Sequence, residues 1–290
     1  MASFRALQTK YASLLKQFTV SPLDFEVFTS IPTSGSRSPG VLYVLDSSFN
    51  PPTWAHLRIA GSALLGRPEP DSRLLLLLAI QNADKPSNLA SFEDRLAMME
   101  LFAHDLRSYI SAKITSQNGS TSMARISTCS IDIGVTKKPY FIDKATVIEN
   151  SGVYSNLPEQ VHLTGYDTLI RIFNAKYYPP EYTLAPLAPL FSKHRLRVTM
   201  RPSDQWGGRE EQEAFLRGLA SGDREQEGAQ REWVERIQLV EGRKPDQEPV
   251  SSTRARKAIK SASQDLEWLV PDNVRHFLLS ESPYASEGSL

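Results

Sequence analysis

The sequence predicts an α/β fold in which a parallel sheet is covered by helices on both faces. Short apolar runs typical of buried strands alternate with amphipathic stretches of helical length. Such alternation favours right-handed strand–helix–strand units, whose sheets bind ligands at the carboxyl ends of their strands. The 290 residues are enough for one large α/β domain or two small ones.

The first elements follow this alternation. Residues 4–18 carry apolar side chains on one helical face and predict a helix, and a loop rich in Ser, Pro and Gly follows over 31–40. The apolar run Val41–Leu45 predicts a buried strand, residues 53–65 predict a helix, and residues 73–80 predict another strand.

The later elements repeat the pattern. Ser91, with Asp94 three residues on, predicts the N-cap of a helix that runs through Leu106. Residues 123–133 alternate in polarity like a strand, and residues 140–149 suit a helix. The remaining predictions are strands over 161–163, 196–200 and 236–240, and helices over 167–173, 210–219 and 255–260.

Composition excludes several classes of protein. The 33 basic and 33 acidic residues cancel, which argues against a protein that coats nucleic acid through bulk charge. The lone Cys129 cannot form an intramolecular disulfide or a cysteine-based zinc site, so we expect a reducing compartment. The longest apolar run, Leu74–Ile80, is too short to span a bilayer, so no membrane association is expected.

The N-terminal segment bears on the compartment. Residues 1–23 contain no acidic side chain and have an amphipathic pattern, as a mitochondrial presequence has, but arginine is sparse. A helix packed on the domain is the simpler interpretation. We therefore expect a cytoplasmic or nuclear protein, with the mitochondrion as the alternative.

The chain divides into three parts. We expect an N-terminal helix and loop over 1–40, a main domain over 41–282 and a tail over 283–290. Residues 203–232 are charged and contain glycines, which is typical of a solvated insert or mobile connection. Neither a Walker A loop nor the dinucleotide fingerprint Gly-x-Gly-x-x-Gly is present.

Two distant segments place polar groups at predicted helix N-termini. In the first, Asn50-Pro51-Pro52 forces a sharp exit from a strand, and His56 follows Thr53 by one helical turn. Without other context, a lone histidine at such a position is more often structural than functional. In the second, Ser251-Ser252-Thr253 precedes Arg254 and Arg256, two cations that oppose the helix dipole unless a polyphosphate binds there. Roughly 195 residues separate the segments, so the fold must bring them together.

These residues resemble a known family. Ser48-Phe49-Asn50-Pro51-x-Thr53-x-x-His56-Leu57-Arg58 resembles the (H/T)xGH signature of nucleotidyltransferases, most closely in nicotinamide mononucleotide (NMN) adenylyltransferases of the fungal, cytidylyltransferase-like branch. Three later segments resemble that family in the same order: Gly165-Tyr166-Asp167, Val198-Thr199-Met200-Arg201, and Ser251-Ser252-Thr253-x-x-Arg256 with Trp268-Leu269-Val270-Pro271-Asp272 after it.

The resemblance implies a Rossmann-like nucleotidyltransferase fold and transfer of an adenylyl group from ATP to NMN, giving NAD and pyrophosphate. It implies catalytic roles for Thr53, His56 and Arg256. The ATP-binding residues that it implies are Ser48, Phe49, His56, Ser251, Ser252, Thr253, Arg254 and Arg256. The NMN-binding candidates are Ser48, Phe49, Lys85, Tyr140, Gly165, Asp167 and Arg201. No side chain is assigned as a metal ligand, because Mg²⁺ would be held mainly by the ATP phosphates.

The chain departs from the family pattern at several positions. The family usually has Gly where this chain has Ser47, and the signature Gly is Ala55. The tryptophan segment that stacks on nicotinamide has no clear counterpart. Tyr140 is the candidate for that stacking, although a rim or core position fits it as well, and Lys85 is assigned to phosphate by position alone.

Two alternatives remain from the sequence. One is another (H/T)xGH enzyme, a cytidylyltransferase or a pantetheine-phosphate adenylyltransferase, and nicotinic acid mononucleotide is a second possible acceptor. The other is an ATP-binding regulatory protein with little transferase activity, a role that Ser47 and the charged insert would suit.

Overall fold

A single mixed sheet organises the part of the chain that the structure describes. This computed structural model describes residues 3–33, 38–66, 72–81, 90–117, 130–201, 206–242 and 247–284. Over these ranges the sheet has seven strands in the order β1-β4-β3-β2-β5-β6-β7. The strands are β1 (Phe25–Ile31), β2 (Val41–Asp46), β3 (Ser72–Ala79), β4 (Ser130–Thr136), β5 (Glu159–Gly165), β6 (Arg195–Thr199) and β7 (Ile237–Val240).

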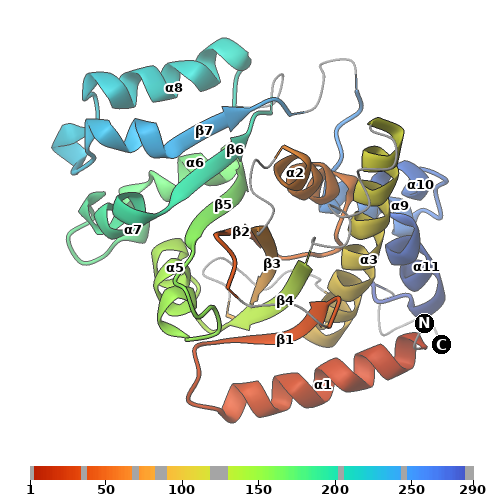
Figure 1. The fold of residues 1–290 in the computed structure, drawn as a ribbon. Helices are drawn as coiled ribbons and strands as arrows, with labels where there is room; N and C mark the ends of the chain where they lie inside the picture. Colours follow the sequence, from red (N-terminus) through yellow and green to blue (C-terminus); the bar gives the residue numbers. More distant parts are fainter. Residues whose placement is uncertain are drawn as a thin grey trace.

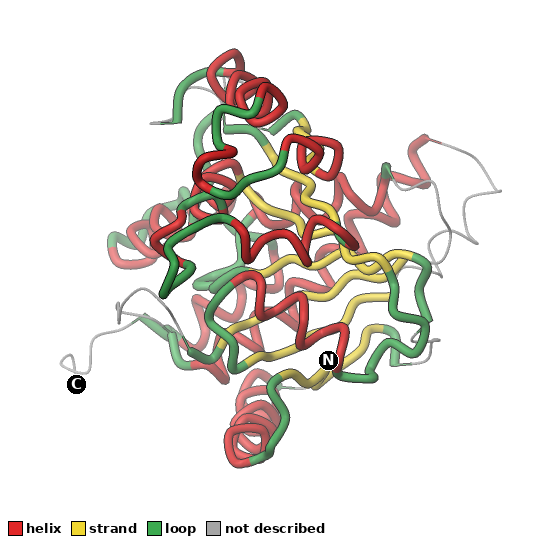
Figure 2. Tube along the Cα trace, turned by 90° about the vertical axis from the view of Figure 1, so that its left-hand side faces the viewer, coloured by secondary structure: helices red, strands yellow, loops and turns green. Residues whose placement is uncertain are grey.

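Helices cover both faces of this sheet (Figures 1 and 2), because the side chains of each central strand alternate between two cores. Tyr43 of β2 belongs to one core, and Leu42 and Val44 belong to another. The first face packs against α1 (Phe4–Val20), α2 (Trp54–Leu65), α3 (Phe92–Gln117), α9 (Ser252–Lys260), α10 (Leu266–Leu269) and α11 (Asp272–Glu281). The opposite face packs against α5 (Phe141–Asn150), α6 (Tyr166–Ile172), α7 (Ala188–Lys193) and α8 (Arg209–Ser221).

The predicted fold class is confirmed, with one addition. Strands β2 to β7 pair in parallel, but β1 pairs antiparallel with β4 and forms an edge of the sheet. No strand was predicted before residue 41. Burial along β1 does not alternate, and its register shifts between Val27 and Thr29, so the segment lacks the period-two pattern by which strands are recognised.

The strand order reverses next to β2. The chain builds β2, β3 and β4 outward in one direction and then returns to place β5 on the other side of β2. In open α/β sheets this reversal leaves a crevice at the carboxyl ends of the two central strands. Asp46 and Gly165 are the last residues of β2 and β5, so the residues that follow them border that crevice.

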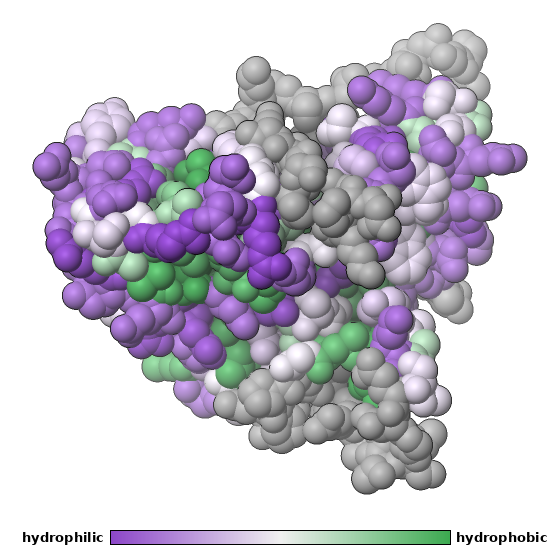
Figure 3. Space-filling model, turned by 90° about the horizontal axis from the view of Figure 1, so that it is seen from above, coloured by the Kyte–Doolittle hydropathy of each residue, from purple (hydrophilic) through white to green (hydrophobic). Residues whose placement is uncertain are grey.

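The expectation of a solvated insert over 203–232 holds only for its outer surface, which is largely hydrophilic over α8 (Figure 3). The inner face of α8 packs Phe215, Leu216 and Leu219 against a core that includes Trp233. Gln212, in the same helix, is fully buried. The many charged side chains led to the prediction of a solvated segment. The apolar residues at helical spacing pack it against the domain instead.

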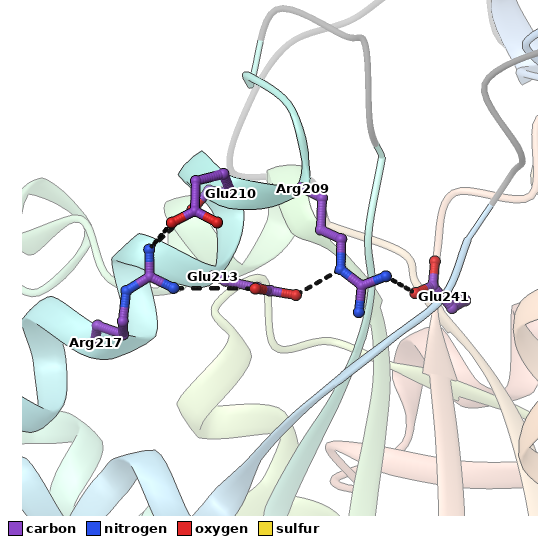
Figure 4. Close-up of polar contacts among 5 residues, drawn as sticks. All are labelled: Arg209, Glu210, Glu213, Arg217 and Glu241. Carbon is purple, nitrogen blue, oxygen red and sulfur yellow. Dashed lines mark hydrogen bonds and ion pairs between the residues drawn. The ribbon is translucent and has the colours of Figure 1, made fainter.

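Outer-face charges of α8 form a chain of ion pairs (Figure 4). Arg217 pairs with Glu210 and Glu213, and Arg209 pairs with Glu213 and with Glu241, which directly follows β7. All five side chains are substantially exposed, so the chain of pairs contributes little to stability. Its effect is to link the start of α8 to the loop that leaves the sheet.

Other predicted boundaries shift modestly. Helix α3 continues beyond the predicted end at Leu106, because Ile110 and Ile114 extend its apolar face by two further turns. The strand predicted over 123–133 is described only from residue 130, and Cys129 lies outside the described residues. No helix in the described ranges is long and apolar enough to cross a membrane.

Candidate active site

The sequence-predicted residues gather at the carboxyl edge of the sheet. Ser48 and Phe49 follow β2, Gly165 ends β5 and is followed by Asp167, and Arg201 follows β6. Because β2, β5 and β6 are adjacent and parallel, their ends lie side by side at this edge.

His56 lies at the N-terminus of α2 and bonds through both ring nitrogens. Its Nδ1 accepts from the backbone N–H of Thr53 at 3.0 Å and lies 2.9 Å from the Thr53 hydroxyl. Its Nε2 lies 3.0 Å from the hydroxyl oxygen of Ser47. A backbone N–H can only donate, so Nδ1 is the acceptor and the neutral ring carries its proton on Nε2.

The ring of His56 is uncharged near neutral pH. Burial, followed by the positive charge of Arg201, lowers the pKa of His56 to about 4. Any phosphate contact made by His56 therefore uses a neutral N–H donor, and arginines must supply the positive charge at this site.

The loop between β2 and α2 is held in place by a buried ring and by a hydrogen bond from α3. Phe49 is fully buried, has φ of 45°, and packs its ring 5.4 Å from the ring of His56. Arg95 of α3 is 1% exposed and donates from Nε to the carbonyl oxygen of Ser48 at 2.7 Å. These contacts fix the backbone of Ser48 and Phe49 without using its N–H groups.

The second segment meets the first, as the sequence requires. The Ser252 hydroxyl donates to the carbonyl oxygen of Pro51 at 2.8 Å, a contact between residues 201 positions apart. Arg256 donates from Nη1 to the carbonyl oxygen of Asn50 at 2.6 Å. The N-termini of α2 and α9 are thereby joined through one loop.

The other residues of the second segment divide into two groups. Ser251 caps α9 by accepting from the backbone N–H of Arg254 at 3.2 Å, and Thr253 is exposed beside Arg256. The Arg254 side chain is engaged elsewhere, because it pairs with Glu248 at 2.9 Å and lies 5.0 Å from the ring of Trp268. Of the two arginines, only Arg256 bonds to the loop after β2.

Gly165 leaves room for two charged side chains. A Cβ at this position would lie 2.6 Å from Asp167 Oδ1 and 3.3 Å from Arg201 Nε. Asp167 and Arg201 form an ion pair at 3.4 Å, and both are partly exposed. This glycine therefore keeps a carboxylate and a guanidinium close to the end of β5.

A cavity of about 550 Å³ opens between α2 and the ends of β6 and β7. Its polar lining includes Arg58, Arg201, Glu241 and Ser251, and Tyr109 and Ile59 contribute apolar surface. The buried hydroxyl of Thr199, which also lines it, has no hydrogen-bond partner in the described ranges. The volume suits a nucleoside.

Tyr140 lies at a smaller cavity of about 180 Å³, on the opposite face of the sheet from α2. Lys144 and Tyr177 also line it, and Lys144 bonds to Asp46 at the end of β2 at 2.5 Å. Tyr140 is 37% exposed, so its ring is accessible. Lys85 lies outside the described residues.

A curated relative decides the family. The chain is 33% identical, over 95% of its length and 97% of the relative's, to a Schizosaccharomyces pombe protein named "Putative nicotinamide mononucleotide adenylyltransferase". The chain belongs to the NMN adenylyltransferase family. The predicted family and the predicted class of enzyme, a nucleotidyltransferase, are thus confirmed, whereas no family model matches the chain.

A solved structure supports the fold of this family member. A Plasmodium falciparum nicotinic acid mononucleotide adenylyltransferase, solved in complex with NaAD, matches with a TM-score of 0.52 at 13% identity. The match covers 84% of this chain and 97% of that one. At this identity the likeness shows the arrangement of the sheet and helices, and nothing about substrate.

Three residues that hold the candidate site in place were not predicted from the sequence. Arg95 bonds to Ser48, and Tyr284, placed in the predicted tail, donates to Asn50 Oδ1 at 2.8 Å. Gln212 holds the main chain of Arg201 by accepting from its N–H at 3.0 Å and donating to its carbonyl at 2.8 Å. None of these three positions belongs to a local motif, so the sequence held no signal for them.

Proposed function

We propose that this chain transfers the adenylyl group of ATP to NMN and releases NAD and pyrophosphate. The observation that carries the proposal is the junction of the two motifs: His56 and Thr53 at one helix N-terminus and Ser252 and Arg256 at another, joined through Asn50 and Pro51. Two helix N-termini that meet at one point suit a polyphosphate.

The reaction needs little from the protein in proton transfer. An oxygen of the NMN 5′-phosphate attacks the α-phosphorus of ATP, forming one P–O bond, and the bond to the β-phosphate breaks with its electron pair leaving on pyrophosphate. Because the nucleophile is already ionised, no general base is required. Catalysis then rests on alignment and on stabilisation of the charge that develops on the phosphoryl oxygens.

The two motifs would share that work. His56 would act toward the α-phosphate as a neutral donor through its Nε2–H, which meets the hydroxyl of Ser47 in this structure, in line with its lowered pKa. Arg256, with Ser252, Thr253 and the N-terminus of α9, would hold the β- and γ-phosphates that become pyrophosphate. Arg254 would contribute only after leaving Glu248.

The nucleoside parts have separate places. We infer that the adenosine occupies the 550 Å³ cavity, whose lining combines the polar side chains of Arg58, Arg201 and Ser251 with apolar surface. The mononucleotide would meet the backbone of Ser48 and Phe49, and Asp167 would bind a ribose hydroxyl beside Gly165. Tyr140 would stack on the pyridine ring from the smaller cavity.

Magnesium would arrive with ATP. In the described ranges no group of three or more His, Cys, Asp or Glu side chains is placed to hold a metal ion. A Mg²⁺ ion coordinated by the triphosphate would neutralise part of its charge. The protein would then bind the remaining phosphate oxygens through Arg256 and the helix N-termini.

The test is an initial-rate assay of purified protein with ATP and Mg²⁺. Separate reactions offer NMN, nicotinic acid mononucleotide and phosphopantetheine, and one replaces ATP by CTP. His56→Ala is compared with His104→Ala, which removes an exposed histidine on α3 and is a matched control.

We expect NAD from NMN and ATP, a loss of about 100-fold or more in kcat/KM for His56→Ala, and wild-type rates for His104→Ala. A wild-type protein that makes product only with CTP or phosphopantetheine, or that binds ATP and makes no product, would contradict the proposed reaction. Product from nicotinic acid mononucleotide alone would replace the acceptor and keep the reaction class.

A further inference from the structure

Ser47 departs from the family pattern and touches the histidine of the signature motif. It directly follows β2, and its backbone N–H donates to the carbonyl oxygen of Leu77 at 3.3 Å, which extends the β2–β3 pairing by one residue. Its main chain is therefore tied to the sheet. From this fixed position its hydroxyl oxygen reaches to 3.0 Å from His56 Nε2.

The direction of this hydrogen bond follows from the other side of the ring. The backbone N–H of Thr53 occupies Nδ1, so the neutral imidazole has its proton on Nε2. Nε2 then donates and the Ser47 oxygen accepts. A hydroxyl that accepts in this way keeps its own proton free to donate to a further acceptor.

The Ser47 hydroxyl lies beside the loop that joins the two motifs. Ser47 and His56 are both only partly buried. The loop that follows, from Ser48 to Asn50, is the loop at which α2 and α9 meet. The partly buried hydroxyl of Ser47 thus lies next to the loop that borders the proposed phosphate site.

We propose that Ser47 is a further catalytic residue, whose hydroxyl accepts a hydrogen bond from His56 and donates one to a nonbridging oxygen of the α-phosphate of ATP. This inference rests on the proposed function. Where glycine occupies this position, only the histidine N–H can donate to the phosphate. With serine, the hydroxyl group stands between the histidine N–H and the phosphate oxygen and donates in its place. Hydrogen bonds in series polarise one another, and a hydroxyl that accepts from His56 becomes a better donor to the oxygen on which charge develops.

The experiment compares wild type with Ser47→Ala and Ser47→Thr in the assay with ATP and the mononucleotide that the protein uses. Each protein is also assayed with the two diastereomers of ATPαS, in which sulfur replaces one nonbridging α-oxygen. Sulfur is a weaker hydrogen-bond acceptor than oxygen, so the oxygen-to-sulfur rate ratio reports contact with that atom. The ratio is taken within one variant, so a partly unfolded preparation does not change it.

We expect Ser47→Ala to lose about 10- to 100-fold in kcat/KM for ATP and Ser47→Thr to retain most of the activity. For one diastereomer the oxygen-to-sulfur ratio should fall in Ser47→Ala and persist in Ser47→Thr. A purely structural role for Ser47 would leave both ratios unchanged.

Full activity of Ser47→Ala, or wild-type ratios for both diastereomers in that variant, would overturn the proposal for Ser47 and leave the proposed function standing. A wild-type protein that forms no dinucleotide from either pyridine mononucleotide would overturn both.

Discussion

Arg256 donates to the carbonyl oxygen of Asn50 across 206 positions of the sequence, at 2.6 Å. Asn50 receives two further bonds at its side-chain oxygen, from the backbone N–H of Ala90 at 3.1 Å and from the hydroxyl of Tyr284 at 2.8 Å. Three distant parts of the chain therefore determine the position of one loop residue. This loop includes Phe49, whose ring packs against His56, and it leads into the helix that bears His56.

Replacement of Arg256 should separate the two motifs. We expect Arg256→Ala to lose about 2 kcal/mol of transition-state stabilisation, or about 30-fold in kcat/KM, because a charged donor and the loop contact disappear together. Arg256→Lys keeps the charge without the planar fork and should recover only part of the loss. Initial rates are compared with those of Lys260→Ala, a charge removed from the exposed end of the same helix. Equal rates for Arg256→Ala and Lys260→Ala would contradict this account.

Gln212 should act on the nucleotide site through Arg201. Gln212→Leu leaves the N–H and carbonyl of Arg201 without their partner, and we expect a cost of about 1–3 kcal/mol in the free energy of unfolding. Because Arg201 lines the larger cavity, the KM for ATP should rise more than kcat falls. Urea unfolding and saturation kinetics measure the two effects. Gln226→Leu, in an exposed part of the same segment, is the matched control, and a KM as low as the control's would contradict the link.

A buried ion pair between β3 and β4, away from the carboxyl ends of the strands, should affect stability alone. Asp132 receives two bonds from Arg73, at 2.5 and 2.7 Å, with one from Tyr154 at 2.8 Å and one from Ser30 at 2.6 Å. Asp132→Ala removes both ion-pair hydrogen bonds from a buried guanidinium and should lower the free energy of unfolding by about 3–5 kcal/mol. Below its Tm, the folded variant should keep wild-type KM values. A raised KM with unchanged stability would contradict this separation.

Acid should destabilise the fold through His162. This residue of β5 is 1% exposed, and burial, with contributions from His194 and Lys144, lowers its pKa to about 3. Between its ordinary pKa of about 6.5 and that value, the unfolded state binds the proton and the folded state does not. Stability is therefore complete above about pH 6.5 and falls as the pH decreases toward 3.

The check is urea unfolding of wild type and His162→Phe at pH 7 and pH 4.5. The free energy of unfolding of wild type should fall by a few kcal/mol more than that of the variant, because one pKa unit corresponds to about 1.4 kcal/mol. His194, whose pKa is also lowered by burial, remains in both proteins. Parallel pH dependence in the two proteins would show that His162 is not responsible.

The sequence predicted the parts of the site that belong to local motifs. His56, Thr53, Ser252 and Arg256 lie where helix N-termini were expected, because capping residues and strand-to-helix turns leave a local signal. The parallel order of β2 to β7 likewise follows from alternating strand and helix patterns. Arg254 was predicted from its motif to bind phosphate, but in the structure its side chain pairs with Glu248 and lies over the ring of Trp268.

The rest of the site depends on contacts between segments far apart in the chain. Arg95 was part of a predicted helix, Gln212 of a presumed surface segment and Tyr284 of a presumed tail, and each bonds to a residue at least 11 positions away. Side-chain bonds to main-chain groups at such separations leave no period or spacing in the sequence. Strand β1 was missed for a related reason, because an edge strand with a shifted register has no regular alternation to detect.

The distance between the two motifs has a consequence for synthesis on the ribosome. A growing chain that has emerged as far as β7 already contains His56 and every strand of the described sheet, yet it lacks Ser252, Arg256 and Tyr284. The loop at Asn50 is held in place only when the last portion of the chain arrives. An unfinished or prematurely terminated product would therefore contain every strand of the described sheet without the contacts that join Asn50 and Pro51 to Ser252 and Arg256.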